Sequence, residues 1–414
     1  MTAASASPKG RTRTLLLMAL ALVLAMSPWF SASAVLGSLR TTWGFGDSFG
    51  AWLTIAVQLG FVAGALGSAA SGLADRLPAR RLIVVAALGA ALANACVLAA
   101  QSPVHLLLAR MATGACLALV YPPAMKLIAT WFVRGRGLAL GVLIGAISVG
   151  SALPHLVNAL GGARWQGVIV WTSAATVAGA LVIALGVREG PYPFPRAPFR
   201  LRDIAAIVRN RGVVLASLGY FGHMWELYAM WAWFATFAMT AAAVDGDATR
   251  ASWLAFATVA AGLVGCVLAG GLADRFGRAR TAMAALLISG ACCVAAGWAH
   301  LAPLWLLLTL GLVWGASVIA DSAQFSALVT EHGDPHTVGT ALTLQMGLGF
   351  LLTVATIWIV PLLAGALGSW RWVFLVLLPG PALGIAAMWA LQRAARRADG
   401  SPRPGAVAGS QRTA

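Results

Sequence analysis

Long apolar segments separated by short charged turns dominate this chain. Apolar residues make up 60% of its 414 residues and charged residues only 10%, whereas roughly a quarter of the residues in soluble domains are charged. A helix of about 20 apolar residues crosses a hydrocarbon core of about 30 Å. The pattern therefore predicts an all-α membrane protein and excludes a water-soluble fold.

Twelve such segments can be marked along the chain. We expect membrane-spanning helices at about residues 14–38, 48–70, 82–101, 103–126, 138–160, 165–187, 212–240, 249–270, 281–300, 303–328, 338–364 and 370–392. The first contains Pro28, which removes a backbone hydrogen bond and predicts a bend. Beside Ser31 and Ser33 this bend is either a simple kink or an opening that presents a polar wall to a cavity.

A charged island occurs twice and divides the chain in two. Ser71–Arg81 reads SGLADRLPARR and Gly270–Arg280 reads GGLADRFGRAR, with Asp75 and Asp274 in equivalent positions 199 residues apart. Because half of the twelve spans precede the middle of the chain, we expect two pseudo-symmetric bundles of six helices.

The domain organisation follows from this division. We expect a disordered cytoplasmic arm, an N-terminal six-helix bundle, a Pro- and Arg-rich cytoplasmic linker, a C-terminal six-helix bundle and a disordered cytoplasmic tail, at residues 1–13, 14–187, 188–211, 212–392 and 393–414. Lys9 to Ala34 also resemble a cleavable signal peptide. Cleavage would leave eleven spans and break the match between the halves, so we expect the first span to be retained.

The cations predict the topology. The net charge is +16, but the Lys and Arg residues are interleaved with the spans instead of forming one basic domain, which argues against nucleic acid as a partner. Most of them fall in the segments that are cytoplasmic if the amino terminus is inside, as the positive-inside rule requires. The loop Glu331–His336 is an exception without Lys or Arg. We therefore expect a multi-pass protein of a bacterial cytoplasmic (inner) membrane with both termini cytoplasmic.

Twelve spans in two halves, a basic central linker and the repeated island together resemble the major facilitator superfamily (MFS) of secondary transporters. In that family the island joins helices two and three and recurs between helices eight and nine. The first copy departs from the pattern at Ser71 and Pro78, and Arg110 with Gly114 matches the family's fourth-helix motif R-x-x-x-G. The second copy fits at Gly270, Leu272, Asp274, Arg275, Gly277, Arg278 and Arg280.

The resemblance implies a conformational latch at the two islands. An aspartate at an inner helix end can pair with an arginine or cap the N-terminus of a facing helix. Such contacts lock the halves in one state and break in the other. The expected latch residues are Asp75, Arg76, Asp274, Arg275, Gly277 and Arg278. The alternative is that these residues only set the topology.

Ionisable residues deep in the spans form the candidate substrate and proton site. Transporters of this kind bind substrate near the midplane between their repeats, and charges inside a membrane mark function by default. The candidates are Arg110, His223, Glu226, Asp321 and His155. Arg110 and Glu226 differ in depth by about 8 Å or less by helical rise. Either Arg110 binds an anionic substrate while Glu226 or His223 takes the coupled proton, or Arg110 and Glu226 form a permanent ion pair.

The substrate class has two competing predictions. The segment Trp131–Gly141, WFVRGRGLALG, resembles the corresponding loop in small-anion and organic-anion permeases of the superfamily, of the cyanate or oxalate/formate type. This favours a proton-coupled symporter or antiporter of a small anion. The rival is an efflux pump for hydrophobic or cationic compounds, which Glu226 and the many aromatic residues would suit. A non-transporting membrane sensor or scaffold is a third hypothesis.

No enzyme is predicted. The sequence contains no GxSxG, HExxH or GxxxxGK[ST] motif. Its five cysteines lie in apolar runs without metal-ligand spacing. We expect no catalytic residue, no metal and no cofactor. The expected partners are a small-molecule substrate, protons and the lipid bilayer, and the family resemblance implies a monomer.

Overall fold

The computed structural model describes residues 10–133, 135–161, 164–192 and 200–398, without the side chains of residues 47, 48, 74, 75 and 201. Within these ranges every regular element is a helix and no strand occurs. The predicted all-α fold is confirmed. The predicted domain boundaries stay predictions, although α1 already begins at Arg11 and the last helix continues to Ala398.

The first half of the chain forms helices α1 to α10. Their bounds are α1 Arg11–Ala25, α2 Ser31–Ala34, α3 Leu36–Trp43, α4 Asp47–Ser71, α5 Leu73–Arg76, α6 Ala79–Ala95, η1 Cys96–Ala99, α7 Pro103–Leu117, α8 Tyr121–Ala129, α9 Arg136–Gly161 and α10 Trp165–Gly186. Several of them are two pieces of one span, because α7 and α8, for example, are joined by a single turn.

The second half forms helices α11 to α19. Their bounds are η2 Leu201–Asp203, α11 Ile204–Arg209, α12 Arg211–Met239, α13 Ala248–Ala260, α14 Gly262–Phe276, α15 Arg278–Ala299, α16 Leu304–Ala320, α17 Ser322–His332, α18 Val338–Leu367, η3 Val373–Leu377 and α19 Pro379–Ala398. Together with the first half they make two six-helix bundles, as the repeat predicts.

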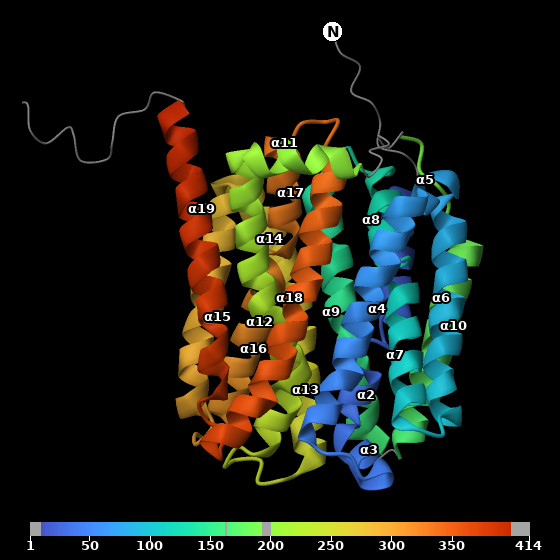
Figure 1. The fold of residues 1–414 in the computed structure, drawn as a ribbon, viewed down its shortest axis with the longest axis vertical. Helices are drawn as coiled ribbons and strands as arrows, with labels where there is room; N and C mark the ends of the chain where they lie inside the picture. The colour runs from blue at the N-terminus through green and yellow to red at the C-terminus, as the bar shows by residue number, and fades with distance from the viewer. Residues whose placement is uncertain (1–9, 134, 162–163, 193–199, 399–414) are drawn as a thin grey trace, which may run out of the picture.

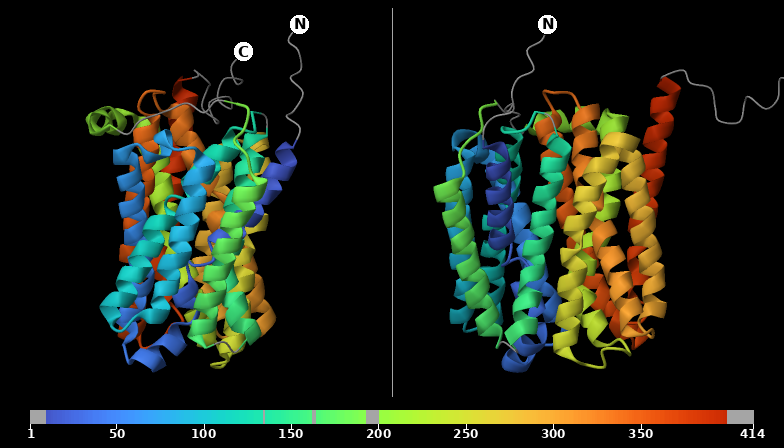
Figure 2. Two further views of the ribbon diagram at one scale, coloured as in Figure 1. Left: turned by 90° about the vertical axis from the view of Figure 1, so that its right-hand side faces the viewer. Right: turned by 180° about the vertical axis from the view of Figure 1, so that it is seen from behind.

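The spans run roughly parallel to one axis (Figure 1). Helices α5 and α11 and the last turns of α19 lie at one end of the bundle, which we call the linker end, and α3 lies at the other, the α3 end. Seen from behind, helices α1 to α10 occupy one side and helices α12 to α19 the other (Figure 2).

Ten of the twelve expected spans are helices long and apolar enough to cross a membrane, within the part of the chain that is described. The other two are the first and the seventh. The seventh is α12, which is continuous over 29 residues and carries His223 and Glu226 in its middle. The first is broken into α1, α2 and α3.

The halves pack against each other along two seams. Helix α9 of the first half lies along α13 and α14, and α4 lies along α18 of the second half. At Gly141 of α9, an added Cβ would lie 2.8 Å from the carbonyl oxygen of Cys266 in α14. Glycine therefore brings the two backbones close together at this seam.

Glycine also sets the position of α7. At Gly114, one turn after Arg110, an added Cβ would lie 2.0 Å from the carbonyl oxygen of Val57 in α4. No side chain fits there, so α7 lies directly against the backbone of α4. This contact fixes the depth and direction at which Arg110 enters the first bundle.

Candidate functional site

The guanidinium of Arg110 is buried in the first half, and its side chain is 1% exposed. It donates to the carbonyl oxygens of Pro28 at 2.9 Å, Trp29 at 2.5 Å and Leu53 at 3.5 Å. It also donates to Ser31 Oγ and Asn94 Oδ1, both at 3.0 Å. All of these acceptors are neutral, and none of the described carboxylates forms an ion pair with Arg110.

The break in the first span supplies these carbonyl groups. Proline has no N–H and its ring clashes with the preceding helical turn, so Pro28 ends the regular helix in a turn over residues 26–30. Carbonyl groups freed in this way need donors, because a buried unpaired polar group is costly in a membrane. Arg110 donates to two of them, Pro28 and Trp29, and Ser31 also donates to Pro28. The predicted bend is thus a break that a residue of the fourth span holds in place.

Asn94 of α6 completes the environment of Arg110. Its Oδ1 accepts from Arg110 and from Ser31 Oγ at 2.9 Å. Its Nδ2 donates to Thr172 Oγ1 at 3.0 Å and Ser173 Oγ at 2.9 Å in α10. The amide therefore joins the first, third, fourth and sixth spans, and its orientation aims the oxygen at the guanidinium.

Glu226 lies in the second half, also 1% exposed. Its Oε1 accepts from Trp314 Nε1 at 2.6 Å and from Cys293 Sγ at 3.2 Å, and its Oε2 accepts from Ser289 Oγ at 2.9 Å. The donors come from α15 and α16. Glu226 thus points into its own bundle, away from the first half.

His223 and Asp321 form a second buried ionisable group in the same half. His223 Nδ1 lies 2.7 Å from Asp321 Oδ1, and each side chain is 1% exposed. Asp321 occupies the junction between α16 and α17. His223 and Glu226 are three residues apart on α12, so they lie on neighbouring turns of one face. The sequence-predicted proton residues of the second half are therefore close together.

The structure does not bring Arg110 and Glu226 into contact. Each is bound by partners from its own half, and no ion pair joins them. Helical rise gave them similar depth but says nothing about the direction in which each side chain turns. A permanent ion pair between them is absent from this state of the protein.

A row of polar residues on α9 faces the other half. Its two ends bind there: Ser148 Oγ donates to the carbonyl oxygen of Val259 at 2.5 Å, and Asn158 Nδ2 donates to Ser252 Oγ at 2.8 Å. Ser151 and His155 lie between them at helical spacing on the same face. Yet neither Ser151 Oγ nor His155 Nδ1 has a hydrogen-bond partner among the described residues. They are buried, polar and unpaired at the boundary between the halves.

Six aromatic side chains bridge the two halves where the first span is broken. This central aromatic cluster consists of Trp29, Phe30, Phe61, Tyr228, Trp231 and Phe350. Phe61 and Phe350 stack across the boundary with ring centroids 4.1 Å apart. The ring of Tyr228 contacts both Trp29, at 5.5 Å, and Trp231, at 5.7 Å.

Unpaired donors accompany this cluster. The indole N–H groups of Trp29 and Trp231 and both amide atoms of Gln58 are buried without a partner among the described residues. Gln58 precedes Phe61 by one turn of α4, so it also faces the second half. An indole N–H can only donate. The boundary between the halves therefore carries buried indole and amide donors, and the Gln58 amide oxygen as an acceptor, that no described protein group satisfies.

The second island places Asp274 at the boundary of the halves at the linker end. Asp274 Oδ1 lies 3.6 Å from the position that a Cβ on Gly137 would take, at the start of α9. This places the carboxylate near the N-terminus of the facing helix, and its capping role stays a prediction. Gly277 has φ +89°, a conformation that favours glycine.

The other predicted latch residues lie apart from this contact. Arg278 Nε donates to Glu331 Oε1 at 2.5 Å, within the second half. Arg76 and Arg275 are exposed. The side chain of Asp75 lies outside the described part of the chain.

No group of three or more His, Cys, Asp or Glu residues that could hold a metal ion occurs in the part of the chain that was described. The five cysteines are free. Sequence reasoning missed Asn94, Gln58 and Ser151, although each is a polar residue in an apolar run. That signal marks them as groups that need a partner or a ligand, although it does not show which of them lack one.

Comparison with known proteins gives one family. The family model described as Major Facilitator Superfamily matches residues 18–246 and 227–412, which together cover most of the chain. A search of curated proteins gave no match to this sequence.

Two solved structures are similar to this one in fold. One is a bacterial homologue of the human lysosomal transporter Spinster, in an inward-facing and unoccupied conformation: 17% sequence identity, 94% of this chain and 96% of that chain covered, TM-score 0.65. The other is the proton:xylose symporter XylE bound to 6-bromo-6-deoxy-D-glucose: 16% identity, 93% and 96% covered, TM-score 0.71.

Proposed function

This chain belongs to the Major Facilitator Superfamily, and from that membership we propose that it moves a small organic or inorganic anion across the membrane by alternating access. As a member of the family it is a multi-pass transmembrane transporter with a secondary-transport fold. The substrate class, the coupling ion and the residues that bind them are the content of the proposal.

The unpaired donors at the boundary of the halves carry the anion assignment. Trp29 Nε1 and Trp231 Nε1 are buried without partners and meet through the ring of Tyr228. The backbone carbonyl of Trp29 is bound to Arg110, a buried cation with only neutral acceptors, so the positive charge lies in the same stretch of the first span as the indole. An anion accepts hydrogen bonds and is attracted by that charge at low dielectric. A cationic substrate would find Gln58 Oε1 as an acceptor there, but it would also meet the indole donors and the positive charge of the first half.

Proton coupling is assigned to the second half. His223 with Asp321 and Glu226 with its three donors are the buried ionisable groups there. Protonation of a carboxylate changes it from acceptor to donor, so it would disturb the contacts of Glu226 to Trp314, Cys293 and Ser289. Helix α12 also carries Tyr228 and Trp231 of the central aromatic cluster. His223 and Glu226 thus lie on the same helix as Trp231, one of the two indole donors.

Efflux of hydrophobic compounds is the second candidate. The central aromatic cluster favours it, because stacked rings bind apolar and cationic compounds. Glu226 does not support it: three donors from its own half bind the carboxylate, which leaves no reason for a cation to replace them. The aromatic cluster alone carries this alternative.

Solute flux in proteoliposomes tests the proposal. The panel contains small carboxylates, inorganic anions and hydrophobic cations, each with and without an imposed pH gradient. Anion flux that follows the gradient supports proton-coupled anion transport. Flux of hydrophobic cations alone contradicts it and makes efflux the function.

The remaining expectations belong to the same proposal. We propose that the protein lies in a bacterial cytoplasmic membrane as a monomer, with the linker end cytoplasmic. Most of the cations gather at the linker end of the predicted topology, which supports this orientation. Asp274 of α14 lies near the start of α9 in the other half, and this placement supports a latch that holds the linker end closed.

A further inference from the structure

We propose that a pocket between α12 and α19 at the linker end binds the phosphate headgroup of an anionic phospholipid. The pocket lies apart from the proposed transport site and has a volume of about 380 Å³. This inference does not depend on which substrate is transported, because lipid binding is measured on the purified protein.

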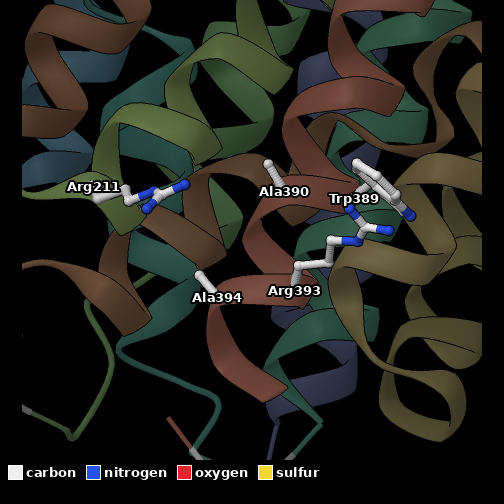
Figure 3. A pocket seen from close by; sticks show the side chains of 5 residues that line it. All are labelled: Arg211, Trp389, Ala390, Arg393 and Ala394. Carbon is white, nitrogen blue, oxygen red and sulfur yellow. The ribbon is translucent and has the colours of Figure 1, made fainter. Parts of the chain in front are cut away.

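Two arginines from two different helices line the pocket. Arg211 is the first residue of α12, and Trp389, Ala390, Arg393 and Ala394 come from α19. Figure 3 shows the Arg211 side chain extending from α12 towards α19, with the Arg393 side chain close to the indole of Trp389. The Arg393 Cζ lies 3.4 Å from the centre of the Trp389 ring. This stacking holds the guanidinium in place while its N–H groups stay available.

No described carboxylate compensates these charges. Neither Arg211 nor Arg393 takes part in an ion pair within the described residues, and no acidic side chain lines the pocket. Two like charges at one pocket repel each other. A phosphate group bound in the pocket offsets these charges and accepts hydrogen bonds from planar guanidinium groups.

The position of the pocket favours a lipid as the source of that phosphate. An exposed stripe runs along α19 through Ala382, Ala386 and Trp389 to Arg393, at spacings of four, three and four residues. It therefore forms one face of the helix. Its apolar part would lie along the acyl chains. Arg393 lies five residues before Ala398, the last described residue of α19, a rise of about 8 Å that fits the headgroup region.

Lipid binding to the purified full-length protein tests this. Native mass spectrometry in detergent would measure the affinity for phosphatidylglycerol, cardiolipin and phosphatidylcholine, for the wild type and for Arg211→Gln/Arg393→Gln. Because each charge-assisted hydrogen bond contributes about 1.5 kcal/mol or more, we expect the double variant to lose anionic lipid affinity about tenfold or more. The affinity for phosphatidylcholine should not change between the two proteins.

The matched control is Arg13→Gln/Arg188→Gln. Both residues are exposed arginines near the same end of the bundle, so this variant loses the same net charge without touching the pocket. Equal loss in both double variants would show nonspecific attraction and overturn the proposal. So would unchanged lipid affinity in the pocket variant. Inorganic phosphate that displaces the lipid at low millimolar concentration, with no gain from acyl chains, would show a free-anion site instead.

Discussion

Arg110 Nη2 donates to the carbonyl oxygen of Trp29 at 2.5 Å and so joins the fourth span to the break in the first. The indole N–H of Trp29 has no partner among the described residues at the boundary of the halves. Trp29 therefore connects a buried cation to the place where we propose that substrate binds. The predictions below separate the structural part of this arrangement from its part in transport.

Arg110→Lys keeps the charge but loses the fork of donors. Lysine has three donors on a single nitrogen, so it cannot serve the five acceptors that Arg110 binds through three nitrogens. Because the freed carbonyl groups are buried, we expect a loss of about 1–3 kcal/mol of stability and a loss of anion uptake. Thermal unfolding in detergent and uptake in proteoliposomes measure the two effects. Uptake at the wild-type rate would contradict a role of Arg110 in anion binding.

Asn94→Asp keeps the shape of the side chain but places a negative charge beside Arg110. The new carboxylate would lie where Asn94 Oδ1 now lies, 3.0 Å from the guanidinium, and would neutralise Arg110 without removing it. We expect the protein to remain folded, as seen by size-exclusion chromatography, while anion uptake falls by about tenfold or more because the attraction at low dielectric is lost. If uptake is unchanged, the charge of Arg110 does not attract the substrate.

Ser151→Ala and Ser148→Ala form a matched pair on α9. Ser148 binds Val259 across the boundary, whereas Ser151 binds no described group. We expect Ser148→Ala to lower the thermal midpoint. Ser151→Ala should leave the midpoint unchanged and raise the KM for the anion by about twofold to tenfold, the value of one neutral hydrogen bond. An unchanged KM in Ser151→Ala would remove this hydroxyl from the site.

Glu226→Gln and Asp321→Asn identify the coupling residue. Each substitution keeps the shape but removes a proton-binding carboxylate. We expect Glu226→Gln to lose uptake driven by a pH gradient while exchange of labelled for unlabelled anion continues. Asp321→Asn should show the same split if the pair with His223 carries the proton. Gradient-driven uptake at the wild-type level in both variants would place coupling elsewhere.

His300, the first residue after the observed span Arg278–Ala299, gives a pH dependence of stability. Burial, together with the neighbouring Arg371, lowers the pKa of His300 below its usual value of about 6.5. The folded protein therefore prefers neutral His300, so its contribution is present above about pH 6.5 and is lost as the pH falls below that value. At pH values below 6.5, we expect the thermal midpoint of the wild type to fall with decreasing pH more steeply than that of His300→Gln. Parallel curves would exclude this contribution.

The spans could be predicted from the sequence because length and apolar composition determine them. The expected segment 165–187 corresponds to the observed span Trp165–Gly186, and 138–160 to Arg136–Gly161. Pro28 correctly predicted an interruption, because proline's effect on a helix is local. These features depend only on neighbours in the chain.

The partners of the buried charges could not be predicted in the same way. Arg110 and Glu226 have similar depth, but each turns into its own half. That direction depends on close packing, such as the approach of α7 to α4 at Gly114. Gln58 and Ser151 escaped notice because they are neutral, and only the arrangement of the two halves shows that they lack partners.

The break in the first span has a consequence for biosynthesis. Arg110 follows Trp29 by 81 residues, so the first span enters the membrane before its donor has been made. Until then the carbonyl group of Trp29 lacks its donor, at a cost of several kcal/mol in hydrocarbon, whereas the carbonyl group of Pro28 still accepts from Ser31. We expect nascent chains that end before α7 to insert this span less completely than chains that include Arg110, as glycosylation mapping of truncated chains would measure. Because of the order of synthesis, the first span is fully hydrogen-bonded only after the fourth span has been made.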